Sequence, residues 1–165
     1  MTLLFPVGRR SIKRYEIYIL CAVHGERRGL TLDIHTFDDL LRAARAQPQP
    51  QRLLFVFAGA ELPEDSSPEQ RRRFVAGRGG ALFPLMCVDK TPEELHTFAA
   101  LVEESHSVGQ AWAIVFVASL AGHGGRPPTS EEAEAPLRSM VESIKAGTHR
   151  AFIPFGPDGH PIRFD

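Results

Sequence analysis

Three uninterrupted apolar runs constrain the fold of this chain more than any other feature of its sequence. They cover Leu53 to Phe57, Leu82 to Val88 and Trp112 to Ala118, and they are rich in branched and aromatic residues. Such a strand buries both of its faces, which is typical of a parallel sheet. We therefore predict a sheet that is covered by helices on both sides.

Segments with helical signals alternate with these runs. Each begins with a Ser or Thr N-cap, and two of them also carry Pro at the first helical position followed by an acidic or amide residue, which is the pattern of a capping box. The first three expected helices cover residues 36 to 47, 67 to 76 and 91 to 105, with Thr36, Ser67 and Thr91 as their N-caps.

A fourth helix is predicted from the apolar spacing of Leu137, Met140, Val141 and Ile144. Pro136 would clash with the carbonyl four residues earlier if the helix were capped at Ser130, so we expect a start near Ala133. After Gly147, residues 151 to 155, the turn GPDG and residues 161 to 164 have the pattern of a β-hairpin.

The predicted fold class is α/β: a single three-layer domain over residues 31 to 165. We expect a mostly parallel sheet of about five strands, helices on both faces and a C-terminal β-hairpin. Residues 1 to 30 differ from the rest, since six basic and two acidic residues give them a net charge of +4. They are expected to be an appendage: a disordered basic arm, an extra edge strand near Tyr15 to Ala22, or an extension from an upstream start codon.

Composition limits the partners and the compartment. The chain has a formal net charge of −1, and residues 31 to 165 are acidic, so nucleic acid is an unlikely partner. The apolar stretch from Tyr15 to Val23 is too short to span a membrane, and no membrane partner is expected. Cys21 and Cys87 lie far apart in apolar runs, which is typical of reduced thiols and favours the cytoplasm.

Four segments resemble a family of small uncharacterised proteobacterial proteins, some of which are labelled ribonucleotide reductase subunit alpha. The segments are FDDLLRAARAQPQPQRLLFVFAGAELPED, GGALFPLMCVDKTPEEL, FAALVEES and AEAPLRSMVESIKAG, and the resemblance extends from Thr36 to Phe155. It implies a domain type and carries over no functional residue. Ribonucleotide reduction needs a large barrel with several cysteines, so the label implies no such activity for a domain that contains two.

The loop SLAGHGGRPPTS after the third run has the strongest pattern of a ligand-binding site. Its glycines, including Gly124 and Gly125, would let backbone amides approach an anion, while His123 supplies a titratable ring and Arg126 a positive charge. The alternative is a long, flexible crossover loop in which Gly and Pro only form turns.

Asp89 and Lys90 follow the second run and precede a helix, a common position for functional residues in α/β folds. If the strands are parallel, the loops after Ala58, Val88 and Ala118 meet at one sheet edge. His123 would then be an acid or base, Asp89 its orienting carboxylate, and Lys90 with Arg126 would hold an anion. Equally, Asp89 caps the helix and Lys90 is solvated.

Other motifs argue against common enzyme classes. There is no G-x-S-x-G nucleophile elbow, no Walker A loop and no G-x-G-x-x-G pattern. The seven histidines lack metal-ligand spacing, and the acidic residues Glu61, Glu64 and Asp65 have no regular metal-loop spacing, so we expect no metal and no cofactor. The basic run Arg71 to Arg73 could contact an acidic partner, or it is a solvated helix face.

We therefore predict a small bacterial cytoplasmic binding or regulatory protein without catalysis, with an unknown protein partner or a small anionic ligand. The alternative is a small enzyme or anion-binding domain whose site lies at the C-terminal edge of the parallel strands. Ten residues are predicted to be almost fully buried: Leu54, Phe57, Leu85, Val88, Leu95, Phe98, Ile114, Phe116, Val141 and Ile144.

Overall fold

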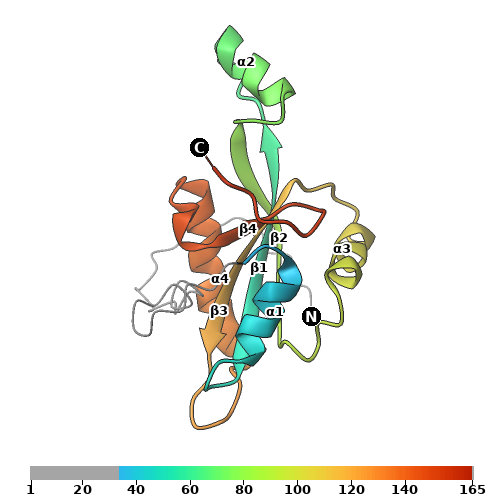
Figure 1. Cartoon of the computed structure of the whole chain (residues 1–165). Helices are drawn as coiled ribbons and strands as arrows, with labels where there is room; N and C mark the ends of the chain where they lie inside the picture. The colour runs from blue at the N-terminus through green and yellow to red at the C-terminus, as the bar shows by residue number, and fades with distance from the viewer. Residues whose placement is uncertain (1–33, 165) are drawn as a thin grey trace, which may run out of the picture.

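A computed structural model describes residues 34 to 164, so the expectations for residues 1 to 30 lie outside the described part. Within these residues, four α-helices and four strands alternate along the chain, and a short 3-10 helix (His149–Ala151) precedes the last strand (Figure 1). In chain order they are α1 (Phe37–Arg45), β1 (Gln51–Glu61), α2 (Pro68–Val75), β2 (Ala81–Lys90), α3 (Phe98–Ser107), β3 (Ile114–Ala121), α4 (Ser130–Lys145) and β4 (Ile153–Phe155).

The prediction of a mostly parallel sheet of about five strands is wrong. The sheet has four strands in the order β2-β1-β3-β4, and every neighbouring pair is antiparallel. β2 and β3 run in the same direction, but β1 lies between them and separates them. The predicted C-terminal hairpin is reduced to the three-residue β4 and a turn, which is closed by a single bridge between Phe155 and Pro161.

The connection between β1 and β2 explains this error. A parallel arrangement would need α2 to cross back over the sheet and bury an apolar face there. The α2 sequence PEQRRRFV has no apolar stripe, and none of its residues is buried. The chain therefore turns back on itself, and β1 and β2 form one long antiparallel ribbon in which Glu61 pairs with Ala81.

Both faces of the sheet are covered by helices, as Figure 1 shows. Side chains of β1 alternate between the faces. Leu53, Phe55 and Phe57 pack with α1 and α3, while Leu54, Val56 and Ala58 pack with α4. A central strand between two helical layers is apolar whichever way its neighbours run, which is why the apolar runs predicted strands correctly and their direction wrongly.

Two helix boundaries differ from those predicted. The Thr91–Glu94 segment forms only a turn, in which the Thr91 amide donates to Glu94 Oε2 at 2.7 Å, and α3 begins at Phe98 with Thr97 as its N-cap. Leu95, between the turn and the helix, is buried in the core. The fourth helix begins at Ser130, not near Ala133.

The early start of α4 has a local cause. Thr129 and Glu132 form a complete capping box at its N-terminus, which compensates in part for the hydrogen bond that Pro136 cannot donate inside the helix. Pro136 is itself buried. The helix thus tolerates a proline that, judged by local sequence alone, favours a later start.

The core follows the prediction at most positions. The seven residues that are buried as expected are Leu54, Phe57, Val88, Leu95, Ile114, Phe116 and Ile144. Leu85, Phe98 and Val141 are only partly buried. A β-bulge near Leu85 shifts the register, because Phe57 pairs with Met86 whereas Ala58 pairs with Pro84.

Candidate functional site

A buried polar cluster, which we call the Arg52 cluster (Arg52, Asp89, Ser130), lies at the end of β2 beside the N-terminus of α4. Asp89 Oδ2 accepts a hydrogen bond from Arg52 Nη1 at 2.6 Å and another from Ser130 Oγ at 2.7 Å. The Asp89 side chain is 1% exposed and that of Arg52 is 11% exposed. Asp89 is therefore an enclosed, paired carboxylate.

The Arg52 guanidinium makes further contacts within the protein. Its Nε donates to the Pro128 carbonyl at 2.5 Å, and Nη1 also lies 3.3 Å from Ser130 Oγ and 3.9 Å from a Glu94 carboxylate oxygen. These contacts tie β1 and β2 to the loop before α4. The cluster thus holds elements together, and Nε and Nη1 of Arg52, Oδ2 of Asp89 and Oγ of Ser130 bond within the protein.

Lys90 points to the opposite face of the sheet from Asp89, as successive residues of a strand do. Its Nζ lies 2.8 Å from Glu104 Oε2 of α3. Asp89 and Lys90 are consecutive in sequence, but their side chains lie on opposite faces of the sheet and belong to two different ion pairs. They do not act as one site.

The His123 loop is an exposed tight turn whose amides are largely occupied. His123 and Arg126 exchange backbone hydrogen bonds of 3.1 Å, and Gly124 and Gly125 both have positive φ, as in a type I′ hairpin turn. The Gly125 amide donates to the side chain of Gln49 at 3.0 Å. Within the described part of the chain, Gly124 is the residue of this turn whose amide has no hydrogen-bond partner, so the backbone leaves one amide free for a ligand.

Glycine is required at position 122 for a packing reason. A Cβ there would lie 2.0 Å from the Arg126 carbonyl oxygen, and the Gly122 amide donates to the Pro50 carbonyl at 2.8 Å. The glycine therefore closes the turn against the start of β1 and is not needed for ligand access.

Arg126 forms an exposed ion pair with Glu132, at 3.3 Å. The pKa of Glu132 is lowered, mainly because its carboxylate accepts the backbone hydrogen bond of Thr129 and also because Arg126 is near. Arg126 thus belongs to the N-terminal region of α4.

The expected convergence of three loops at one edge is wrong for β1. Since β2 and β3 both run antiparallel to β1, their C-terminal ends meet at one end of the sheet, and β1 ends at the other. The Asp89 and His123 segments therefore share an end of the sheet. Asp89 is nevertheless enclosed by the Arg52 cluster while His123 is exposed, and no hydrogen bond joins their side chains within the described residues.

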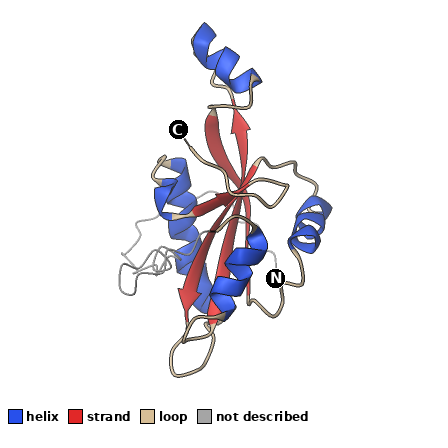
Figure 2. Cartoon of the chain, in the orientation of Figure 1, coloured by secondary structure: helices blue, strands red, loops and turns tan. Residues whose placement is uncertain are grey.

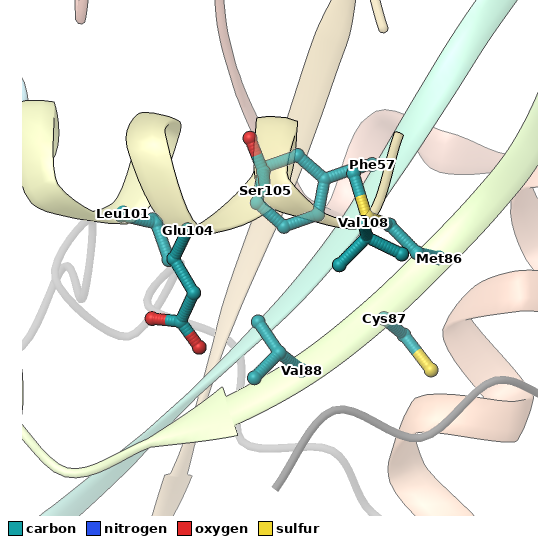
Figure 3. A pocket seen from close by; sticks show the side chains of 8 residues that line it. All are labelled: Phe57, Met86, Cys87, Val88, Leu101, Glu104, Ser105 and Val108. Carbon is teal, nitrogen blue, oxygen red and sulfur yellow. The ribbon is translucent and has the colours of Figure 1, made fainter. Parts of the chain in front are cut away.

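A shallow depression lies elsewhere, between α3 and β2 (Figure 3). Its lining is mostly apolar, its volume of about 10 Å³ holds one water molecule at most, and it contains none of the six predicted site residues. Cys87 is on β2 beside it, and burial raises the pKa of this thiol to about 11, with a further contribution from the charge of Asp89. At neutral pH the thiol is protonated and weakly nucleophilic.

One end of the β1-β2 ribbon projects from the domain, a feature that was not among the expectations from the sequence. We call residues 61 to 81 the arm: the ends of the two strands, α2 and their connections. Figure 2 shows the ribbon extending beyond the other elements and carrying α2 at its tip. The absence of an apolar stripe in α2 is the sequence signal that could have identified it.

Most side chains of the arm are exposed, although Leu62, Ser66 and Phe74 are partly buried. Several of its charges lack partners within the described residues. Val75 is 87% exposed. Arg71 donates to the Glu64 and Ser66 carbonyls at 3.2 Å, whereas the guanidinium groups of Arg72, Arg73 and Arg78 make no hydrogen bond or ion pair within the described part of the chain. Of the clusters found, the arm therefore presents the most unsatisfied charge.

Comparison of the chain with protein-family models, with curated proteins and with solved structures found no match. Within residues 34 to 164, no group of three or more His, Cys, Asp or Glu side chains is arranged to hold a metal ion. None of the helices in that range is long and apolar enough to cross a bilayer.

Proposed function

We propose that this chain is a small, non-catalytic binding protein of the bacterial cytoplasm, and that the arm is its binding surface. The observation that carries the proposal is α2, a helix of eight residues with no buried side chain, held away from the core at the tip of the ribbon. The partner in this proposal is a protein that pairs with the charges of the arm.

An arm of this kind contributes little to the stability of the domain. Since Glu61 and Ala81 are paired, a two-residue turn such as Asn-Gly could connect them directly. The chain instead uses 19 residues between them and caps the helix with Ser67 and Gln70. A short helix in water is marginal by itself, and α2 packs on the ribbon through the partly buried Phe74, which lies over Gly80. The remaining side chains of the helix are exposed, which favours a role outside the core.

The alternative, an acid-base or anion site at the end of the sheet, has less support. Its carboxylate Asp89 is enclosed by Arg52 and Ser130, and Lys90 faces the other side of the sheet. The backbone amides that would bind an anion near His123 are mostly bonded within the protein. No residue combination in this region is therefore proposed to be catalytic.

Site-specific photo-cross-linking in the native host tests the proposal. A photoreactive phenylalanine analogue at Val75 of the arm should give a discrete cross-linked product, while the same analogue at the exposed Ala99 of α3 should give none. The Val75 product should disappear when Arg72→Glu and Arg73→Glu are added. Equal products at both positions, or none at Val75, would show that the arm is not the binding surface.

A further inference from the structure

The last described residues of the chain, Pro161 to Phe164, lie against the α4 side of the sheet, and we call them the tail. Pro161 forms the bridge with Phe155, and the Ile162 amide donates to the Pro154 carbonyl at 2.9 Å. The Ile162 side chain packs with the apolar residues of the α4 side. Within the described residues, the backbone beyond Ile162 makes no hydrogen bond, so the end of the tail is held by side-chain contacts.

The ring of Phe164 contacts two other aromatic rings. It stacks on Phe116 of β3, with 6.2 Å between the ring centroids and 9° between the planes, and its centroid lies 4.7 Å from that of His149. The rings of His149 and Phe116 are 5.1 Å apart. We call these three rings the His149 cluster. Phe164 remains 47% exposed, so its contact can open without unfolding the rest of the domain.

His149 brings an unsatisfied polar atom into this cluster. Its Nδ1 is buried and has no hydrogen-bond partner among the described residues. In neutral imidazole this nitrogen can remain unprotonated, whereas in imidazolium it must be an N–H donor. A buried, charged donor without an acceptor costs more free energy than the attraction of two ring faces for a cation returns. The cluster therefore accommodates the neutral ring and opposes the charged one.

The charges around His149 act in the same direction. Burial of the ring lowers the pKa of His149, and the positive charge of Arg150 lowers this pKa further. On α4, Glu142 and Lys145 pair with each other at 3.0 Å. β3 has no ionisable residue, and the tail adds the positive charge of Arg163. Within residues 34 to 164, these elements offer no unpaired carboxylate to a protonated His149.

We propose that the tail is an acid-sensitive latch, in which protonation of His149 releases Phe164 and uncovers the ring of Phe116 beside α4. The docked tail is favoured above pH 6.5, the ordinary pKa of histidine, because His149 is then neutral in both forms. As the pH falls below 6.5, the released form binds a proton more readily than the docked form and gains population. The latch goes beyond the proposed function, since it involves neither the arm nor its partner.

A fluorine label on the tail of the full chain tests the latch. At about pH 7.5, 4-fluorophenylalanine at position 164 should give an NMR signal that differs from that of the urea-unfolded chain, because the ring stacks on Phe116. At about pH 5.5 the signal should move toward the unfolded value, while carboxylates stay ionised. The hydrogen-exchange protection factor of the Ile162 amide should fall several-fold, and that of Phe55 in β1 should not change.

Four variants separate His149 from the other histidines. His149→Phe keeps a third ring in the cluster without a titrating group, so the tail should stay docked at about pH 5.5. His149→Gln is also neutral and should likewise remove the pH dependence. His160→Gln, just before the tail, and His96→Phe, the matched exchange at an exposed position, should both retain the release. Circular dichroism checks that all variants remain folded.

Several results would overturn the latch. They are a label at position 164 that has the unfolded signal even at about pH 7.5, a signal that does not change down to about pH 5.5, and an equal change in His149→Phe and His149→Gln. Loss of the change in His160→Gln would assign it to the other histidine. Loss of Phe55 protection at about pH 5.5 would mean that the whole domain opens, which also contradicts a latch.

Discussion

Arg52 and Asp89 form a buried ion pair, with 2.6 Å between Nη1 and Oδ2, and it joins the first residues of β1 to the last residues of β2. Ser130 adds a hydroxyl donor from α4. A charge pair enclosed in this way stabilises mainly by making the removal of either partner costly, because the other charge is left without compensation.

Replacement of Asp89 by Ala should therefore destabilise the protein by about 3 to 5 kcal/mol. The exposed pair of Arg126 and Glu132 is the matched control, and Arg126→Ala should cost less than about 1 kcal/mol. Urea denaturation of both variants measures the difference. Similar losses in the two variants would mean that the Asp89 charge is not enclosed.

Apolar residues at three depths should respond differently to truncation. Phe57 is fully enclosed between β2, β3 and Trp112, and Phe57→Ala should cost about 3 to 5 kcal/mol. Phe98 is only partly buried against Phe37, so its truncation should cost about 2 kcal/mol, less than full burial would imply.

Val75→Ala completes this series, with a change of less than about 0.5 kcal/mol, because the side chain is exposed. Chemical denaturation gives the three values under one condition. A loss above about 1 kcal/mol at Val75 would place α2 against the core and contradict the description of the arm.

The capping carboxylates should make the free energy of unfolding depend on pH in the acid range, which we call the acid limb of the stability curve. The pKa of Glu132 is lowered by the Thr129 backbone hydrogen bond and then by Arg126, and that of Asp39 mainly by the His35 backbone hydrogen bond. A carboxylate whose pKa is lower in the folded than in the unfolded state stabilises the fold at pH values above its unfolded pKa. This stabilisation is lost as the pH falls below about 4.5 for Glu132 and about 3.8 for Asp39.

Glu132→Gln combined with Asp39→Asn should therefore make the unfolding free energy less dependent on pH below about 4.5. The neighbouring Glu131→Gln, outside the capping box, serves as the control and should leave the acid limb almost unchanged. Thermal unfolding between pH 2 and 7, about 2.5 units on each side of that limit, measures the slope. An acid limb that is equally steep in the double variant would contradict the assignment.

Cys87 should react slowly with thiol reagents in the folded protein. Because burial raises the pKa of this thiol to about 11, the thiolate is scarce at pH 8. Because the pKa of the thiol is higher in the folded protein than its ordinary value of 9.0, its contribution to the free energy of unfolding is complete below pH 9.0. That contribution is lost as the pH rises toward about 11. Peptide mapping after iodoacetamide treatment should show labelling of Cys87 only upon denaturation, and fast labelling of folded protein at pH 8 would contradict its burial.

Inorganic phosphate should not perturb the backbone amides of Gly122 to Arg126 and of Asp89 to Thr91 together. Most of the amides in the turn are bonded to protein acceptors, and the Thr91 amide donates to Glu94. NMR titration to saturating phosphate and sulfate checks this expectation. Joint shifts in both segments would restore the anion site at the end of the sheet.

Local signals in the sequence were sufficient to predict which segments form the helices and strands. Ser67 and Gln70 form the expected capping box, and Pro68 occupies the first turn. The first two apolar runs lie within β1 and β2, and the third overlaps β3, which begins at Ile114, two residues after Trp112. These features depend on neighbours within a few residues, so they are visible without the fold. Thr91 shows the limit of such signals, since a neighbouring cap at Thr97 allows Leu95 to enter the core.

The sequence by itself thus determined where strands and helices form, that helices cover both faces of the sheet, and that α2 lacks an apolar face. Strand direction was decided by tertiary structure, because an apolar strand packs equally well beside parallel and antiparallel neighbours. The partners of Asp89 were decided there too: Arg52 and Ser130 are 37 and 41 residues away in the chain, and only the antiparallel register and the early start of α4 bring their side chains together.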